Sequence, residues 1–520
     1  MKRMVWFRRD LRVHDNPALW HACQGNDGQH IDVIAVSFIC RKQWRQHGMG
    51  DRLIQLTINA MKHLEQQLQA LNIPLLIIDS DTFSDNTQAL QTLCTDLKID
   101  QLYFNYEYEI NEINRDMALN HWADNNRAFS PQLFCYHDQC IIPPGQVLNK
   151  QQQMFKVYSP FRKAWCQHFP QFQQPPLNKP AQITSNHFVT KEAETAVNLL
   201  VSQISAEKLG DEAGVEEVVD SLWPINEELA HQQLQNFLQQ RASDYHNWRD
   251  FPAKPATSRL SCYLSLGLLS GRQCLYSAWQ MNACMLTDGE PGLNGWINEI
   301  IWREFYRHLL VAFPDLNKHK AFKPDTESVP WRYSKTDFDA WCQGKTGYPI
   351  VDAAQRQLLE TGWMHNRLRM ISAMFLTKHL LIDWRWGESW FASHLVDFDL
   401  ASNNGGWQWS ASTGADGAPY FRIFNPITQS QKFDPDGEFI AQFVPELATL
   451  PIKARHQPNA IQRSQCGYAN EIVEHKFARL RALAAFKGEG LLTQPGVDEA
   501  TPETDLFTLT GAGAVSSEKA

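Results

Sequence analysis

The sequence predicts two domains: an N-terminal α/β domain built on a doubly wound, Rossmann-like parallel sheet, and an all-α C-terminal domain. Three observations lead to this fold class. The chain has 520 residues, more than one ordinary hydrophobic core holds. Short β-rich runs alternate with helical patterns in residues 1–140, and helical patterns alone dominate residues 206–485.

The α/β domain is expected to span residues 1–140. Its predicted strands are Met4–Phe7, Ile31–Ile39, Ile73–Ile78 and Gln101–Asn105. The clearest helix between them is Asp51–Leu71, whose apolar residues favour one side, as in a helix that packs on a sheet. Because the segment carries no G-x-G-x-x-G, the usual dinucleotide-binding fingerprint is absent.

Residues 141–205 are rich in proline and glutamine and are predicted to connect the two domains. The second domain, residues 206–485, has predicted helices at Arg272–Met281, Gly295–Phe313, Tyr348–Thr361, Asn366–Leu381 and Gly387–Phe398. The remaining residues, 486–520, are acidic and rich in glycine, proline and threonine, a composition typical of a disordered tail.

The composition is that of a soluble globular protein, with 43% hydrophobic and 20% charged residues. No apolar run approaches the roughly 18 residues that a membrane helix needs, and residues 1–10 lack the apolar region of a secretory signal. The eleven cysteines include no C-x-x-C pair, which argues against a zinc ribbon or an iron–sulfur cluster. We therefore expect a cytoplasmic protein with no membrane partner and no metal.

Charge and tryptophan content are both unevenly distributed. The net charge of −9 argues against a protein that covers long stretches of nucleic acid. Residues 302–323, however, contain five lysines and arginines and only two acidic residues. Such a local basic face suits one docked anionic ligand. Eleven of the 18 tryptophans fall between Trp279 and Trp409, more than packing requires, which indicates stacking surfaces or redox relays.

A phosphate site is predicted at Thr257–Ser261, TSRLS, which follows Pro255 and opens an apolar stretch. Thr or Ser ahead of a helix is an N-cap signal, and helix N-termini present free N–H groups to phosphates. An isolated N-cap is usually only structural. The presence of Tyr245 and Arg249 just upstream favours a binding role.

A second pattern lies on the predicted helix that begins at Gly295. Trp296, Glu299 and Arg303 are three and four residues apart and share a face, and Trp302 lies three residues after Glu299. A carboxylate between two indoles suits a heterocycle that stacks on aromatic rings and offers N–H groups. The alternative is an amphipathic surface helix with an ion pair.

Two further segments concentrate polar groups. GWMHNRLRM, residues 362–370, places Asn366, Arg367 and Arg369 at a helix start. Residues 397–409 bring two carboxylates, two asparagines, two glycines and two indoles together. Asp397 and Asp399 could act as paired acids or bind a metal, but no further ligand keeps metal spacing.

The chain resembles the photolyase/cryptochrome family, most closely the bacterial class I cyclobutane pyrimidine dimer photolyases. The resemblance runs from VWFRRDLRVHDNPAL at Val5 to VEHKFARL ending at Leu480. Its central block reads KTGYPIVDAAQRQL, TGWMHNRLRM, LIDWRWGE, DLASNNGGWQWSASTG and PYFRIFNP. This resemblance implies a monomeric enzyme of the bacterial cytoplasm that repairs UV-damaged DNA with light.

The resemblance also implies a reduced FAD in the helical domain. Its cofactor-binding residues would be Tyr245, Thr257, Ser258, Arg259, Leu260, Ser261, Trp296, Arg303, Asn366, Arg369, Asp397, Phe398, Asp399 and Asn403. Within this set the phosphates would lie on Thr257–Ser261. Asp397 would face the edge of the flavin ring, and Asn403 would approach its N5.

In such enzymes the damaged dinucleotide is flipped out of the duplex into a cavity above the flavin. Glu299, Asn403, Trp302 and Met370 match the family's catalytic residues. The expected DNA-binding residues are Arg249, Glu299, Trp302, Asn366, Arg367, Trp409 and Gln429. Excited FADH⁻ would donate an electron to the dimer, which would split and return the electron.

Two auxiliary features follow from the same resemblance. Trp407, Trp384 and Trp331 match an electron-transfer chain from the flavin to the surface. Asn111, Glu112 and Lys318 match the site of an antenna chromophore, methenyltetrahydrofolate in the most similar relatives, with a deazaflavin as the alternative. Relatives commonly carry cysteine immediately before the lysine, where this chain has Asn317.

The main alternative function is that of a cryptochrome, a blue-light photoreceptor without repair activity. Asn403 favours repair, because plant cryptochromes carry Asp and animal ones commonly Cys at that position. Repair of six-four photoproducts is disfavoured, because MHNRLRM offers one histidine rather than a pair beside the cavity. DASH-type cryptochromes typically carry Gln at the position of Met370.

Overall fold

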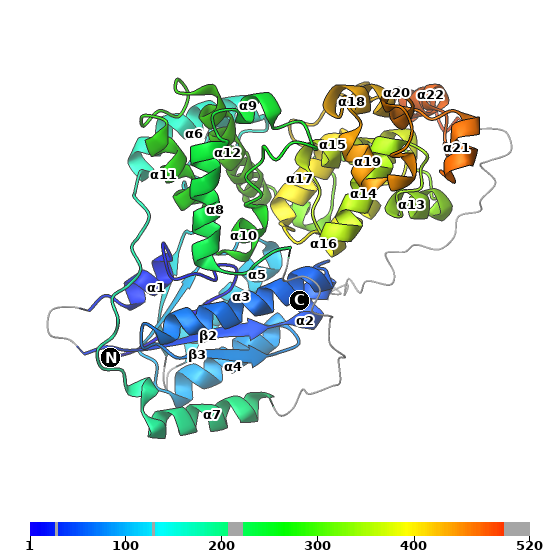
Figure 1. The fold of residues 1–520 in the computed structure, drawn as a ribbon. Coiled ribbons are helices and arrows are strands. Elements are labelled where there is room, and N and C mark those ends of the chain that lie inside the picture. The colour runs from blue at the N-terminus through cyan, green and yellow to red at the C-terminus, as the bar shows by residue number, and fades with distance from the viewer. Residues whose placement is uncertain (26–29, 127–129, 206–221, 493–520) are drawn as a thin grey trace.

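The computed structural model describes residues 1–25, 30–126, 130–205 and 222–492. The predicted boundary between residues 205 and 206 therefore adjoins a segment outside the described residues, and most of the predicted tail, residues 493–520, also lies outside them. The described chain forms a sheet domain with a larger helical part beside it (Figure 1).

The α/β domain contains one parallel sheet of five strands in the order β3-β2-β1-β4-β5. The strands are β1 (Lys2–Trp6), β2 (Asp32–Ile39), β3 (Leu75–Asp79), β4 (Gln101–Asn105) and β5 (Gln132–Tyr136). The doubly wound parallel sheet is thus confirmed. The sequence analysis did not predict β5, an edge strand whose residues are only partly buried and so lack the apolar run of a central strand.

Helices cover both faces of this sheet (Figure 1). They are α1 (Pro17–Ala22), α2 (Arg41–Gln46), α3 (Asp51–Gln69), α4 (Phe83–Asp96), α5 (Ile110–Asn125) and, later in the chain, α7 (Lys191–Ser205). Alternate residues of β1 serve opposite faces. Val5 belongs to the core that includes Leu53 of α3, and Trp6 to the core that includes Leu93 of α4. This alternation follows from the two-residue period of a strand.

Residues 141–205 contain helices that the sequence analysis did not predict. The helix α6 (Tyr158–Phe172) buries Phe161 and Trp165 against the helical domain, and α7 follows a short 3₁₀ turn, η1 (His187–Val189). Prolines within and around α6 obscured its helical period. The segment connects the domains and also contributes to the core of each.

The remaining helices form two neighbouring groups (Figure 1). The first comprises α6, α8 (Glu227–Gln240), α9 (Tyr245–Trp248), α10 (Ser261–Leu266), α11 (Gly271–Met281) and α12 (Pro291–Ala312). The second comprises α13 (Lys335–Cys342), α14 (Pro349–Thr361), α15 (Asn366–Met374), α16 (Trp384–His394), α17 (Leu400–Ala411), α18 (Pro426–Phe433), α19 (Glu438–Phe443), α20 (Ile452–His456), α21 (Ala460–Cys466) and α22 (His475–Phe486). Short 3₁₀ turns lie at η3 (Pro314–Lys318), η4 (Pro324–Ser328) and η6 (Pro445–Leu447), and a π-helical turn, η5 (Phe375–His379), follows α15.

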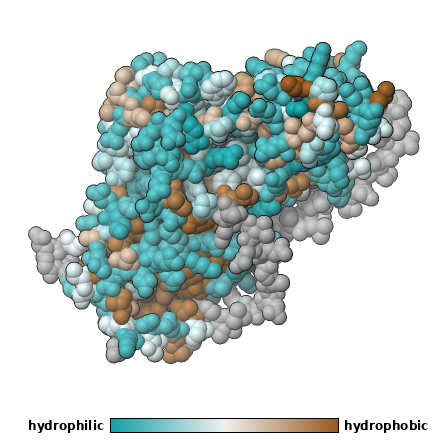
Figure 2. Space-filling model, in the orientation of Figure 1, coloured by the Kyte–Doolittle hydropathy of each residue, from teal (hydrophilic) through white to brown (hydrophobic). Residues whose placement is uncertain are grey.

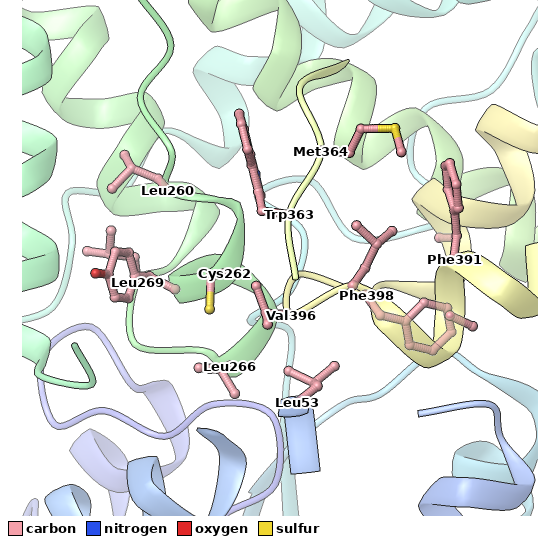
Figure 3. Packing of buried hydrophobic residues seen from close by; sticks show 14 of the residues in the cluster. Leu53, Leu260, Cys262, Leu266, Leu269, Trp363, Met364, Phe391, Val396 and Phe398 are labelled. Carbon is pink, nitrogen blue, oxygen red and sulfur yellow. The ribbon is translucent and has the colours of Figure 1, made fainter. Parts of the chain in front are cut away.

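The two domains meet through a close backbone contact at Gly267, just after α10. A Cβ atom on Gly267 would lie 2.2 Å from the carbonyl oxygen of Arg9, and its φ of +77° disfavours other residues as well. Arg12 donates to the carbonyl of Gly267, and Arg9 donates to the carbonyl of Phe398. Figure 3 shows Leu266 and Phe398 packed above Leu53 of α3 at this junction.

A buried carboxylate, Glu304 of α12, joins α12 to the segment that follows the sheet domain. It accepts hydrogen bonds from the backbone N–H groups of Ile141 and Ile142 and from Trp165 Nε1. Burial raises the pKa of Glu304 to about 7, although these donors favour the charged form.

No helix among the described residues is long and apolar enough to cross a membrane. The face in Figure 2 is largely hydrophilic, with hydrophobic residues in small scattered groups.

Replacing Glu304 with Ala should lower the stability of the protein by about 2 kcal/mol or more, because three buried donors would lose their acceptor. The measurement is the urea midpoint of unfolding. Glu304→Gln, which keeps one acceptor oxygen, is the control and should lose less. Equal losses in the two variants would show that these hydrogen bonds contribute little.

Candidate functional site

Four ion pairs connect the elements that carry the predicted site residues. The pairs are Arg249–Glu299 at 2.6 Å, Arg367–Asp250 at 2.7 Å, Arg369–Asp397 at 2.7 Å, and Arg307 with Asp399. They link α9 to α12, α9 to α15, α15 to the loop before α17, and α12 to α17. The structure therefore brings these elements together around one region between the two groups of helices.

The predicted phosphate segment differs from the expectation in where its helix begins. Helix α10 starts at Ser261, with Leu260 at the N-cap position and no side-chain capping bond, so Thr257 does not cap it. The predicted N-cap is wrong because Arg259 adopts a φ of +53°, which breaks the helical path. Gln233 and Arg241 of the α8 region hold the carbonyls of Ser258 and Thr257.

Aromatic rings line the approach to this segment. Arg259 lies over the ring of Trp363 at 5.1 Å, and Trp363 Nε1 donates to Ser261 Oγ at 3.3 Å. Figure 3 shows Trp363, in the loop before α15, beside the chain that leads through Leu260 into α10. Trp296 and Tyr245 are both buried.

Glu299 and Arg303, on the same face of α12, have different partners. Glu299 is half exposed and accepts from Arg249, whereas Arg303 is partly buried and donates to the carbonyls of Gln139 and Leu264. The ion pair considered in the sequence analysis therefore forms between α12 and α9, and not between Glu299 and Arg303. Burial, with the neighbouring Arg307, lowers the pKa of Arg303 to about 10.

Asp397 presents a carboxylate oxygen without a partner. Its Oδ2 accepts from Arg369 Nη2, and its Oδ1 is buried with no hydrogen-bond partner in the described structure. A buried acceptor of this kind is costly unless a ligand satisfies it. The free Oδ1 is therefore suited to an N–H donor of a bound heterocycle.

Asp399 and Asn403 begin helix α17, which the sequence analysis did not predict. Asp399 caps the helix by accepting from the backbone N–H of Ser402, and it also pairs with Arg307. Arg307 and Arg303 hold the pKa of Asp399 below its usual range despite burial. Asn403 is half-buried and donates to the carbonyl of Glu388.

Trp302 stacks on a residue that sequence reasoning missed. The ring of Tyr158 lies parallel to it, at 3.5 Å between ring centroids and 8° between planes. The Tyr158 hydroxyl donates to the carbonyl of Asn298, one turn before Trp302 on α12. Because the two residues are far apart in sequence, only an aromatic residue at the start of α6 could have suggested the pair.

The remaining predicted catalytic and DNA-binding residues are at least partly accessible. Asn366 is exposed, and Arg367, Met370, Trp409 and Gln429 are partly buried. Arg367 also lies over the ring of Phe433 at 4.4 Å. His365, which sequence reasoning missed, caps α15 and has its pKa lowered to about 4 by burial.

The three predicted relay tryptophans are buried. Trp384 opens α16, and the ring of Trp407 crosses α16 at Gly387, where a Cβ would lie 2.0 Å from the indole. Trp331 is 8% exposed, and the bridge between Arg332 and Ile382 brings it beside the segment leading into Trp384.

A separate cavity of about 1220 Å³, including its open mouth, lies between the sheet and the helical domain. It is lined by residues that follow β1, β2 and β4, at the carboxyl edge of the sheet where the strand order reverses. Asn111, Glu112 and Asn317 line it, whereas Lys318 is exposed and pairs with Asp315. Burial and the neighbouring Glu112 raise the pKa of Glu109, in its wall, to about 7.

Two family models match the chain. The one described as DNA photolyase matches residues 3–181, and the one described as the FAD binding domain of DNA photolyase matches residues 296–488. A deoxyribodipyrimidine photo-lyase of Escherichia coli (strain K12) is 42% identical over 489 residues, which cover 93% of this chain and 98% of that protein.

Solved structures give the same pattern of similarity. A bacterial class III photolyase from Agrobacterium tumefaciens matches with a TM-score of 0.77 and 33% identity over 94% of this chain and 97% of that chain. An archaeal photolyase from Sulfolobus tokodaii matches with a TM-score of 0.71 and 26% identity over 94% of this chain and 100% of that chain. The latter structure is described as containing two FAD molecules, with the implication of a novel light-harvesting cofactor.

Proposed function

The chain belongs to the DNA photolyase family, and from this premise we propose that it is a deoxyribodipyrimidine photo-lyase, which uses FAD and light to repair cyclobutane pyrimidine dimers in DNA. The observation that carries the proposal is the free, buried Oδ1 of Asp397, which lies within the segment matched by the FAD-binding model. This acceptor fits the N–H edge of an isoalloxazine ring.

The residues around Asp397 fit the rest of the cofactor. Arg369 fixes the Asp397 carboxylate and leaves one oxygen free, while Arg307 keeps Asp399 ionised at the start of α17. The Thr257–Ser261 segment offers hydroxyl and N–H groups to the phosphates. When bound and reduced, FAD supplies the electron that light drives into the dimer.

We assign DNA binding to the accessible residues of the same region. Trp302, already stacked on Tyr158, would present a rigid platform to the damaged dinucleotide once it has been flipped out of the duplex. Glu299, held by Arg249, would accept a hydrogen bond from the dimer. Met370 and Trp409 would complete the cavity walls, and Asn366, Arg367 and Gln429 would contact the backbone.

We assign two auxiliary roles to further groups. Trp407, Trp384 and Trp331 form the proposed relay that reduces oxidised FAD. The cavity at the carboxyl edge of the sheet is the proposed antenna site, where Asn111 and Glu112 would bind methenyltetrahydrofolate, with a deazaflavin as the alternative. Lys318 would have to leave Asp315 to reach this chromophore.

A cryptochrome-type photoreceptor is the alternative function. The retention of Trp302, Glu299, Met370 and Asn403 within one region supports repair instead. We further propose that the protein acts as a monomer and that it works in a reducing cytoplasm. Its eleven free cysteines support the reducing compartment.

Repair itself tests the proposed function. Reduced, FAD-loaded protein is mixed with UV-irradiated oligo(dT), and absorbance at about 260 nm, where unsaturated bases absorb and dimers do not, is followed under blue light and in the dark. Recovery of absorbance only in the light is expected. A normal reduced-flavin spectrum without recovery would favour the photoreceptor or a different lesion.

Substitution of Trp302 by Ala should weaken binding of dimer-containing DNA by about 1–3 kcal/mol, the usual worth of base–aromatic stacking. The measurement is the Kd for a dimer-containing duplex against its undamaged counterpart. Tyr158→Leu should show a smaller loss in the same direction, since it removes only support for the Trp302 ring. Unchanged affinity in Trp302→Ala would show that Trp302 does not contact the flipped dimer.

Replacing Trp331 with Phe should slow photoreduction of oxidised FAD by about tenfold or more while leaving repair by pre-reduced protein intact, because only the relay needs its indole. Transient absorption and the repair assay measure the two activities. Trp279→Phe, outside the proposed relay, serves as the matched control. Parallel loss of both activities would indicate a structural role for Trp331.

A further inference from the structure

The loop after β1 and the start of α8 bring two histidines and a glutamate together at the interface between the domains. His14 lies in that loop, Glu227 is the first residue of α8, and His231 follows one turn later. Their three ligand atoms lie within 4.8 Å of one another. The sequence analysis predicted no metal because His14 and Glu227 are 213 residues apart and show no ligand spacing.

Glu227 is a buried carboxylate in a fixed orientation. Its two oxygens accept hydrogen bonds from the backbone N–H groups of Val13 and His14, both at 2.9 Å. Within the described part of the chain its ion-pair partners are histidines, and no lysine or arginine pairs with it. A buried carboxylate without a permanent cationic partner is costly, so the position favours a bound cation.

The two imidazoles approach this carboxylate from different domains. His14 Nδ1 lies 2.7 Å and His231 Nε2 3.8 Å from Glu227 Oε1. Tetrahedral zinc with bonds of about 2.0–2.2 Å needs ligand atoms about 3.3 Å apart. Small rotations of the two half-exposed histidine side chains would bring all three atoms to that spacing.

Neighbouring groups support the cluster. The backbone N–H of Glu227 donates to His63 Nε2 at 3.2 Å, which fixes the first turn of α8. Gln273 Nε2 lies 3.3 Å from His231 Nε2. When His231 binds a metal through this nitrogen, the Gln273 amide would turn away and could hydrogen-bond to a metal-bound water. The side chain of His14 is 47% exposed, so the site is open to solvent.

We propose that His14, Glu227 and His231 form a zinc-binding site that clips the α/β domain to helix α8. Imidazole nitrogens and one carboxylate oxygen suit Zn²⁺, whereas Mg²⁺ and Ca²⁺ prefer oxygen ligands alone. A water completes the four-coordinate sphere. His14, Glu227 and His231 are not among the residues that line the proposed antenna cavity, and none belongs to the proposed relay. Zinc binding can therefore be tested independently of the repair activity.

Zinc binding to tag-free, FAD-loaded protein tests the proposal after dialysis against a chelator. We expect about one Zn²⁺ per chain by calorimetry and elemental analysis, together with a rise in melting temperature on adding Zn²⁺. Mg²⁺ should produce neither effect. Failure of the protein to bind Zn²⁺ stoichiometrically would overturn the proposal.

Single variants identify the ligands. His14→Gln and His231→Gln should each weaken Zn²⁺ binding by about tenfold or more. His187→Gln, an exposed histidine on the other side of the sheet domain, is the matched control and should bind as the wild type does. Because His14 is half exposed, its replacement leaves the core intact, and undiminished binding in that variant would place the zinc elsewhere.

Discussion

The contact between Gly267 and the backbone of Arg9 and Asp10 sets the distance between the two domains. Any side chain at Gly267 would push the loop after β1 away from α10. The same loop donates, through Arg9, to the carbonyl of Phe398 between Asp397 and Asp399. The proposed antenna cavity and the proposed flavin site therefore share one junction, and a displacement at this point would alter both.

In the proposed flavin site, the charged side chains are already paired with one another before any cofactor binds. Arg369 occupies one oxygen of Asp397, and Arg307 pairs with Asp399 at the head of α17. These pairs leave Asp397 Oδ1 as a buried acceptor without a partner in the described structure, which a ligand could satisfy. A site organised in this way needs little rearrangement when the cofactor binds. Such preorganisation is the main contribution of a protein to chemistry that a cofactor performs.

Much of this organisation could be predicted from the sequence, because it depends on local periodicity. Four strands and α3 follow from alternating or helical patterns, and the motif residues of α12 and α15 lie on helices as expected. Contacts between distant segments could not be predicted. Tyr158 reaches Trp302 from α6, and Glu299 pairs with Arg249, through tertiary packing that no spacing reveals. The start of α10 was misplaced because one backbone torsion at Arg259 interrupts the pattern.

Gly387 of α16 has a consequence beyond packing. It is the residue over which the Trp407 indole crosses the helix, and even a methyl group there would displace that ring. Electron tunnelling rates fall exponentially with the gap between donor and acceptor. Gly387 carries no redox group, yet it sets the position of the Trp407 ring and with it the tunnelling distance in the proposed relay. A larger residue at Gly387 would therefore change the rate of electron transfer.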